Sequence, residues 1–251
     1  MNDKQEEKIS VLMPAYNSEE FIDEAISSIV SQTYSNWELL IHDDNSEDDT
    51  LKKALEWRKT DKRINVSRNY QEHGHFIDMC NDQLAEADGF YVARLDSDDI
   101  ATPDRLAREI ELFESNRFER IVALGALAIE IIKIENSWAE HHSEWLEEYI
   151  KPVASYNEPI NYKLSDFNRV IHSTFFARTQ DVAAVGGYDY IDPLEDYDLM
   201  LKLSKTGNIF VVPENLAIKR KHESNYSKIA KQKLGVALMR LSLRHDIIQI
   251  K

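Results

Sequence analysis

The stretch Phe90-Tyr91-Val92-Ala93-Arg94-Leu95, followed at once by Asp96-Ser97-Asp98-Asp99, is the part of the sequence that decides the fold. A short, largely apolar run bounded by an acidic, turn-forming cluster is typical of a buried strand that ends in a polar loop. Carboxylates placed so close together repel one another unless a cation or hydrogen-bond donors lie nearby. The cluster therefore predicts either a site for Mg²⁺ or Mn²⁺, which prefer oxygen ligands, or a solvated acidic turn that caps the next helix.

Two further apolar runs lie nearer the amino terminus and end in polar clusters in the same way. Ile9–Met13 is ended by a proline, and Trp37–Ile41 leads into the acidic stretch Asp43–Thr50. Apolar residues at helical spacing follow each run, and another strand is expected at Ile64–Ser67 before a helix that begins near Phe76. Such alternation through about the first hundred residues predicts an α/β fold, with a mostly parallel, Rossmann-like central sheet flanked by helices.

Ligands of such a sheet bind in the crevice beyond the carboxyl ends of the strands. Three polar clusters fall at these ends, namely Pro14–Asn17, Asp43–Asp48 and Asp96–Asp99. We therefore expect the three clusters to meet at one edge of the sheet. Taken alone, the middle cluster is also explained by an Asx turn that caps the following helix.

The residues after about position 100 follow a less regular pattern. A helix is expected behind Pro103, and the apolar run Ile121–Ile134 predicts one strand or two. Within His141–Pro159 we expect a helix and a loop. The tail Ile229–Ile250 is predicted to be helical, with an apolar side that either packs on the core or contacts a dimer partner or an anionic membrane.

Composition narrows the classes of function. The chain has 251 residues, 43% of them hydrophobic, and a formal net charge of −15, which argues against nucleic-acid binding because phosphates need basic surface. A nucleotide ligand remains compatible, since a metal ion brings positive charge locally. Cys80 is the single cysteine, so an intramolecular disulfide is excluded. The polar amino terminus has no signal-like apolar region and no apolar run is long enough to span a membrane, so we expect a cytoplasmic protein.

Two clusters in the second half offer further chemistry. Glu195 and Asp196 stand where a helix is expected to begin, a place where the helix dipole favours carboxylates. Either residue also suits a general base at the mouth of a cleft. His222 follows the basic pair Arg220-Lys221 after an expected strand. The histidine is either structural or a metal ligand, and the basic pair suits phosphate oxygens.

Taken together and in order, these pieces resemble the inverting glycosyltransferases of family 2, which have the GT-A fold. The resemblance rests on Ile9-Ser10-Val11-Leu12-Met13-Pro14-Ala15-Tyr16-Asn17, Asp43-Asp44-Asn45-Ser46-Glu47-Asp48, Tyr91-Val92-Ala93-Arg94-Leu95-Asp96-Ser97-Asp98-Asp99, Gly186-Gly187-Tyr188-Asp189, Glu195-Asp196-Tyr197-Asp198-Leu199 and Arg220-Lys221-His222. Each piece is modest, but the ordered set is specific.

The resemblance implies a role for each cluster. Asp98 is the expected metal ligand, with His222 as the second, and the metal is Mn²⁺ or Mg²⁺. Asp196 is the expected catalytic base, supported by Glu195. The residues implied to bind the nucleotide-sugar donor are Pro14, Ala15, Tyr16, Asp44, Arg94, Asp96, Ser97 and His172.

The implied reaction moves a sugar from a nucleotide-diphosphate sugar, most often a UDP-sugar, to a hydroxyl of a glycan or lipid-linked acceptor. We expect one domain over residues 1–251, with a donor half at 1–100, an acceptor and catalytic half at 101–227 and a C-terminal helix at 228–251. Peripheral attachment to the inner face of the cell membrane and a homo-oligomer both stay open.

The sequence departs from the family pattern in two places. The QxxRW motif of processive synthases is missing after Asp196, which disfavours a cellulose- or hyaluronan-synthase role. Cys80 stands where many members have arginine, so Arg94 is a candidate to replace that contact. Two other functions remain to be weighed, a non-catalytic donor-binding module of a glycan-assembly complex and a sugar nucleotidyltransferase. A dehydrogenase is disfavoured because G-x-G-x-x-G is absent.

Overall fold

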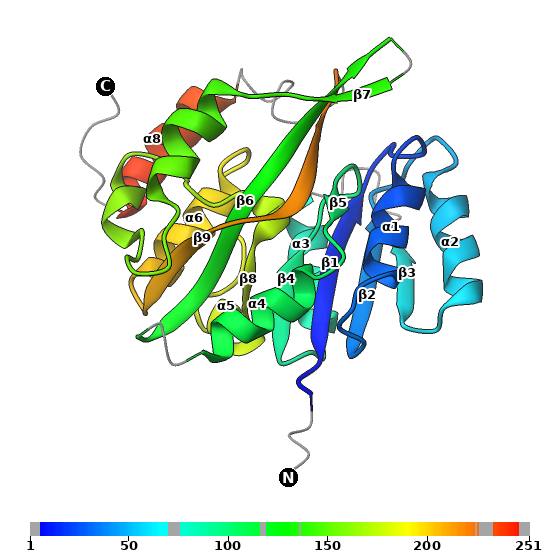
Figure 1. Cartoon of the computed structure of the whole chain (residues 1–251), viewed down its shortest axis with the longest axis horizontal. Coiled ribbons are helices and arrows are strands. Elements are labelled where there is room, and N and C mark those ends of the chain that lie inside the picture. Colours follow the sequence, from blue (N-terminus) through cyan, green and yellow to red (C-terminus); the bar gives the residue numbers. More distant parts are fainter. Residues whose placement is uncertain are drawn as a thin grey trace.

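The computed structural model describes residues 6–69, 76–115, 119–135, 137–223, 225 and 233–245. Strands and helices alternate through the first part of the chain, as the apolar runs predict (Figure 1). The elements there are β1 (Ile9–Ala15), α1 (Ile22–Val30), β2 (Trp37–Asp43), α2 (Thr50–Thr60), β3 (Ile64–Arg68), α3 (Phe76–Glu86) and β4 (Tyr91–Arg94).

The second part carries shorter helices and two long strands that pair with each other within the sheet (Figure 1). Its elements are β5 (Ile100–Ala101), α4 (Arg105–Glu114), β6 (Ile121–Ile134), β7 (Ser137–Glu140), the π-helical turn η1 (Leu146–Ile150), the 3₁₀ turns η2 (Lys151–Val153), η3 (Asn161–Ser165) and η4 (His172–Thr174), then β8 (Phe176–Arg178), α5 (Thr179–Ala184), α6 (Glu195–Ser204), β9 (Asn208–Lys221) and α8 (Leu234–His245). The run Ile121–Ile134 is thus one strand. The helix and loop expected within His141–Pro159 are present, because residues 144–153 form one continuous helical stretch that includes η1 and η2, and a loop follows it.

The described strands form one nine-stranded sheet in the order β3-β2-β1-β4-β8-β6-β9-β5, with β7 paired to β6. β1 pairs in parallel with β2 and β4, β2 in parallel with β3, and β6 in parallel with β9. The short strand β8 is antiparallel to both β4 and β6 and joins the two parallel groups. The mostly parallel α/β sheet predicted from the sequence is confirmed.

Helices cover both faces of the sheet and divide the core into two apolar layers. α1, α2 and α4 pack on the side chains of β1 and β2 that include Val11 and Leu39. α3, α5, α6 and α8 pack on the opposite face, against Leu12, Leu40 and Val92. Alternate residues of one strand therefore serve different layers, which explains why these strands are apolar throughout.

The start of α1 differs from a capping box, which Asn17 and Glu20 resemble in the sequence. The helix begins at Ile22 without a side-chain cap. Asn17 instead adopts a positive φ of 45° and its Oδ1 accepts a hydrogen bond from the Glu47 amide at 2.9 Å. Asparagine tolerates this left-handed conformation and ties the loop after β1 to the loop after β2.

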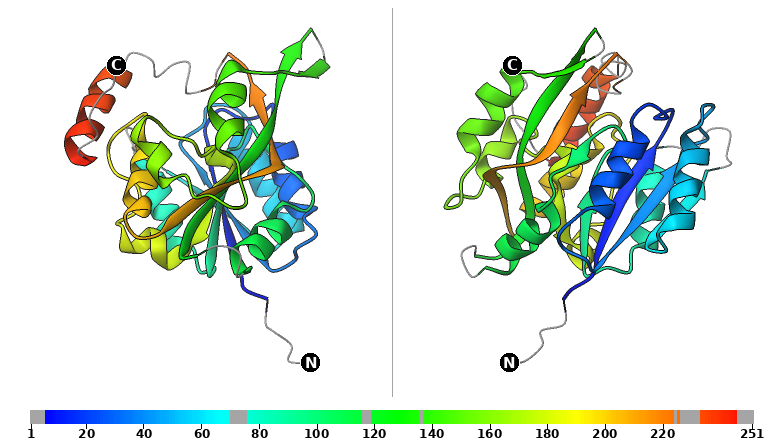
Figure 2. Two further views of the ribbon diagram at one scale, coloured as in Figure 1. Left: turned by 60° about the vertical axis from the view of Figure 1, so that its left-hand side comes forward. Right: turned by 45° about the vertical axis from the view of Figure 1, so that its right-hand side comes forward.

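α8 lies at the end of the molecule opposite α2, on the outside (Figures 1 and 2). Its Ala237 and Leu241 are buried against the core, as expected for a helix that packs on its own domain. A second side of the helix is exposed and also apolar, with Val236, Met239 and Leu243 being 59%, 66% and 74% exposed. The remainder of the helix predicted for Ile229–Ile250 lies outside the described residues. Among the described residues, no helix has the length and apolar character needed to span a membrane.

Candidate functional site

The three polar clusters predicted to meet do lie together at the carboxyl ends of β1, β2 and β4. The Asp44 amide donates to the Ala15 carbonyl at 2.8 Å, which joins the first two loops. Ser18 Oγ lies 2.8 Å from Ser97 Oγ, which joins the first loop to the third. Parallel strands end at the same edge of a sheet, so strand direction alone brings these distant segments into one site.

The residues implied to hold the nucleotide take different positions at this edge. Tyr16 is 58% exposed and available to a ligand, whereas Pro14 and Ala15 are buried in β1. Asp44 Oδ1 accepts a hydrogen bond from Asn69 at 3.1 Å. Ser97 is also buried, and its hydroxyl contacts Ser18. Of these residues, Tyr16 and the partly exposed Asp44 are the ones whose side chains a ligand reaches.

The acidic cluster brings three carboxylates close together. Oxygen atoms of Asp96, Asp98 and Asp99 lie within 4.8 Å of one another. Asp99 is buried, and its two oxygens accept hydrogen bonds from Ser173 Oγ at 2.5 Å and from the Arg220 amide at 2.9 Å. Burial, together with the charges of Asp98 and Asp96, raises the pKa of Asp99 to about 7. Asp99 thus fastens β9 to the loop after β4.

Asp98 and His222, which the sequence pairs as metal ligands, do lie side by side. His222 Nε2 is 2.9 Å from Asp98 Oδ2, and Phe21 stacks on the imidazole with ring centroids 4.5 Å apart. Asn225, a residue to which the sequence interpretation gave no role, donates from its Nδ2 to the same carboxylate oxygen at 3.0 Å. A carboxylate and an imidazole nitrogen beside further aspartates form a donor set that suits Mn²⁺ or Mg²⁺, so the residues fit such an ion.

Arg94 organises the centre of the site from a buried position. Its Nε donates to Asp96 Oδ1 at 3.0 Å, and its Nη1 donates to Cys80 Sγ at 3.3 Å. The guanidinium therefore lies against Cys80, at the place where many family members carry arginine. Burial alone would raise the pKa of Asp96, but the Arg94 charge holds it well below its usual range. Burial raises the pKa of the Cys80 thiol to about 11, so the sulfur stays neutral.

His172 lies on the turn η4 and faces Tyr188. Its Nε2 is 2.8 Å from the Tyr188 hydroxyl. Burial, together with the nearby charge of Arg94, lowers the pKa of His172 to about 3. The imidazole is therefore neutral at physiological pH and offers a hydrogen bond rather than a charge.

Glu195 and Asp196 begin α6 and have different surroundings. Glu195 is buried, and burial followed by the charge of Asp196 raises its pKa to about 8. Asp196 Oδ2 accepts a hydrogen bond from Asn168 Nδ2 at 2.8 Å, and burial raises the pKa of Asp196 to about 6. A carboxylate whose pKa approaches neutrality suits a general base. No motif in the sequence marks Asn168, which approaches Asp196 from a loop 28 positions earlier.

The basic pair before His222 has other partners. The Arg220 guanidinium is buried, donates to the Asp98 carbonyl at 2.9 Å and pairs with Glu24. Lys221 Nζ lies 3.3 Å from Glu130. Both side chains, which the sequence interpretation offered to phosphate oxygens, thus have partners within the protein.

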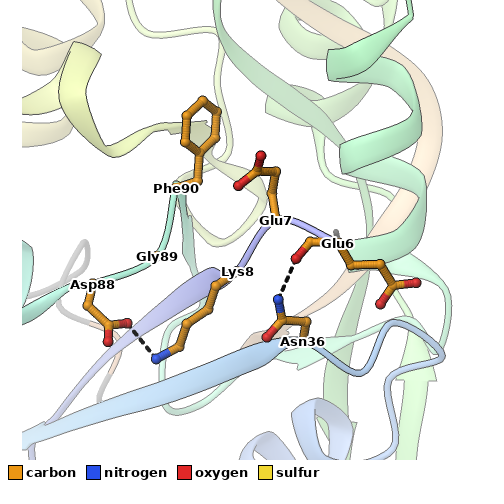
Figure 3. A pocket seen from close by; sticks show the side chains of 7 residues that line it. All are labelled: Glu6, Glu7, Lys8, Asn36, Asp88, Gly89 and Phe90. Carbon is orange, nitrogen blue, oxygen red and sulfur yellow. Dashed lines mark hydrogen bonds and ion pairs between the residues drawn. The ribbon is translucent and has the colours of Figure 1, made fainter. Parts of the chain in front are cut away.

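A separate hollow of about 400 Å³ lies at the amino ends of β1 and β4, remote from this edge (Figure 3). Lys8 bonds Asp88 at 2.5 Å across it, and Asn36 donates to the Glu6 carbonyl at 2.6 Å. Lys8, Asp88 and Asn36 thus already have partners, and none of the predicted site residues lines the hollow.

Two proteins of known sequence are similar to this chain. An uncharacterized glycosyltransferase of Haemophilus influenzae is 33% identical over 224 residues, which are 88% of this chain and 68% of the relative. The Escherichia coli enzyme named UDP-Glc:alpha-D-GlcNAc-diphosphoundecaprenol beta-1,3-glucosyltransferase WfgD is 42% identical over 108 residues, 43% of this chain and 42% of that protein.

Solved structures extend the likeness to the fold. Staphylococcus aureus TarS 1–349 in complex with UDP-GlcNAc superposes with a TM-score of 0.73 at 20% identity, over 94% of this chain and 66% of TarS 1–349. The mannosyltransferase PcManGT of Pyrobaculum calidifontis, in complex with GDP-Man and Mn²⁺, gives 0.72 at 15% identity, over 96% of this chain and 64% of that one. The chain thus spans slightly less than two thirds of these solved structures.

The fold and the acidic edge of its sheet define a GT-A type α/β protein. Residues 10–181 match the description "Glycosyl transferase family 2". The chain belongs to glycosyltransferase family 2.

Proposed function

We propose that the chain transfers a sugar from a nucleotide-diphosphate sugar, most simply a UDP-sugar, to an acceptor hydroxyl by a metal-assisted, inverting displacement. The observation that carries the proposal is that a set of residues suited to a divalent cation and a carboxylate suited to act as a base lie at the same edge of the sheet. A cation-binding set around Asp98 and His222 lies there. Burial raises the pKa of Asp196, and the nearby negative charge of Asp96 also raises it.

Asp196 is the general base of the proposed reaction. It takes the proton from the acceptor hydroxyl while the hydroxyl oxygen forms a bond to the anomeric carbon. The bond from that carbon to the phosphate oxygen breaks, and its electron pair leaves with the nucleoside diphosphate. Attack opposite the leaving group inverts the anomeric configuration. A divalent ion held by Asp98 and His222 supplies charge neutralisation at the diphosphate.

The neighbours support the choice of donor. The TarS structure contains UDP-GlcNAc, and the PcManGT structure contains GDP-Man and Mn²⁺. The exposed Tyr16 and the carboxylate of Asp44 suit the base and ribose of such a nucleotide. The neutral His172 suits a sugar or phosphate oxygen beside Asp96, to which Arg94 is bonded.

For the acceptor we propose a hydroxyl of a glycan carried on a lipid diphosphate. The name of the E. coli relative states such an acceptor. The exposed apolar side of α8 suits contact with the membrane that holds a lipid carrier.

The test combines a panel of UDP-, GDP- and dTDP-sugars with Mn²⁺ and with EDTA. Thermal stabilisation by one donor that requires Mn²⁺, followed by transfer to a glycan acceptor with inversion, is expected. Asp98→Asn should remove the Mn²⁺-dependent part of the stabilisation. Donor binding that is equal with Mn²⁺ and with EDTA would contradict the metal role, and tight binding without turnover would identify a donor-binding module.

A further inference from the structure

Lys219 on β9 opens the basic segment before His222, and the sequence interpretation gave it no role of its own. Arg220, the next residue, turns to the other side of the strand, where its guanidinium lies 5.5 Å from the rings of Phe21 and Trp138. Because successive side chains of a strand point to opposite faces, Lys219 and Lys221 share the face away from these rings. The register of β9 with β6 sets Lys219 opposite Glu130.

The backbone holds Lys219 close to the acidic cluster. Ile218 pairs with Ile100 in the short β5–β9 ladder, and the Arg220 amide donates to Asp99 at 2.9 Å. The residue between them is therefore held beside the loop that carries Asp96 and Asp98. Glu130, its neighbour on β6, is engaged 3.3 Å from the ammonium of Lys221.

The charge of Lys219 reaches both parts of the proposed reaction centre. Burial would lower the pKa of Lys219, but the carboxylates of Asp99, Asp96, Asp98 and Glu130 raise it above its usual value. In turn, the ammonium acts on Asp96 and Asp99 in the cluster and on Asp196 at the start of α6. Lys219 thus lies near both the cluster and the base, yet makes no hydrogen bond or ion pair with the described part of the chain.

The β5–β9 ladder and the bond from the Arg220 amide to Asp99 hold the backbone of Lys219 beside the acidic cluster, so its ammonium suits a diphosphate bound there. A divalent ion held by Asp98 and His222 would neutralise the donor's diphosphate, and the proposed transfer requires the anomeric carbon attached to that diphosphate to face the base. We propose that the Lys219 ammonium binds the donor's diphosphate and neutralises the charge that grows on it as the sugar leaves. This role rests on the proposed function and adds a catalytic cation that belongs to the protein itself.

The inference makes two opposite predictions for Lys219→Met, which keeps the length of the side chain and removes its charge. With donor and saturating Mn²⁺, kcat should fall by roughly 10²-fold, because a preorganised group that stabilises transition-state charge is lost. The affinity for UDP with Mn²⁺ should weaken as well. Without nucleotide, the affinity for Mn²⁺ alone should rise several-fold, because a positive charge beside its carboxylate ligands has gone.

Lys221→Met is the matched control, because it removes the same charge two residues along the same strand, where the ammonium pairs with Glu130. Its kcat should stay within about threefold of wild type. Lys219→Arg should recover most of the lost kcat, which a defect of packing alone would not allow. Melting temperatures of all three variants check that each is folded.

The outcomes separate the two claims. Transfer by Lys219→Met equal to that of Lys221→Met, or weaker Mn²⁺ binding together with unchanged UDP binding, would overturn the role of Lys219 and leave the proposed function intact. If the wild-type chain transfers no sugar from any donor, the proposed function fails. The UDP and Mn²⁺ affinities of the same variants then still decide whether Lys219 holds a diphosphate.

Discussion

In the amino-terminal half of the sheet, three strands run in parallel and deliver three polar loops to one edge, where the Ala15, Asp44 and Ser97 segments bond one another directly. In the carboxy-terminal half, the functional side chains stand on a 3₁₀ turn, a helix start and a strand end. Partners from distant segments hold them, as Tyr188 does for His172 and Asn168 for Asp196. Strand direction positions the first set, and individual long-range contacts position the second. Single substitutions should therefore affect the second set more sharply.

The largest expected effect is on turnover by Asp196→Asn. The amide keeps the shape of the side chain but accepts no proton from the acceptor, so kcat for transfer should fall by about 10²–10⁴-fold. Donor affinity and melting temperature should change little. Asp166→Asn, at a side chain that is 72% exposed, serves as the control. Near-normal transfer by Asp196→Asn would assign the base to a different carboxylate.

The sequence predicts the amino-terminal half of the sheet better than the carboxy-terminal half, because strand direction positions the first and individual long-range contacts position the second. Period and turn chemistry locate β1 to β4 within one or two residues, and parallel strands imply that their loops meet. One local difference is Pro14, which lies inside β1 rather than ending it. β1 pairs with β4 only as far as Leu12, so the missing amide of the proline falls where that neighbour has ended.

The second half resists such prediction for a physical reason. Asn168 and Asn225 contact residues remote in sequence, and the pairing of β9 with β5 brings Lys219 to the acidic cluster. No hydrophobic periodicity or helix cap in the sequence marks these three positions. The acids of α6 and His222 became candidates because short motifs mark them, but their partners are products of the tertiary fold. The Arg220-Lys221 pair shows the reverse case, since a basic motif was visible and its charges are taken by Glu24 and Glu130.

The anchor of α8 on α6 should have the next largest effect, on stability. Asp198 is fully buried, and its carboxylate lies 2.8 Å from His245 Nε2, 3.3 Å from Arg244 and 3.4 Å from Lys202. Asp198→Ala takes the buried carboxylate away from His245, while Lys202 and Arg244 keep their ion pairs with Asp189. The free energy of unfolding should fall by about 3 kcal/mol. Urea titration measures the change.

A double-mutant cycle of Asp198→Ala with His245→Ala sharpens this test. Coupling between the two positions should exceed about 0.5 kcal/mol, because each side chain is buried against the other. Additive effects would show that α8 is held by its apolar contacts instead, through Ala237 and Leu241.

A smaller effect is expected on the pH profile. Asp196 acts as a base only when ionised, and burial raises its pKa to about 6, so kcat should fall roughly tenfold for each pH unit below that value. Asn168 stabilises the ionised form by its hydrogen bond, so Asn168→Ala should move this limb to higher pH by about one unit. At pH 8.5 the two proteins should turn over within about threefold of each other. A uniform loss at every pH would show that Asn168 only maintains the loop.

The smallest effect is expected on the exposed side of α8. Met239 and Leu243 are 66% and 74% exposed, so changing both to Gln should alter the free energy of unfolding by less than about 0.5 kcal/mol. Donor hydrolysis in solution should stay unchanged, because neither side chain is near the acidic edge. If this side contacts a membrane, the double variant should bind anionic vesicles more weakly and should lose activity on a lipid-linked acceptor while keeping it on a soluble glycan.

Leu241→Ala, on the buried side of the same helix, is the contrasting variant, and it should lower the free energy of unfolding by about 2–5 kcal/mol. Equal vesicle binding by wild type and the Gln variant would restrict α8 to its structural role.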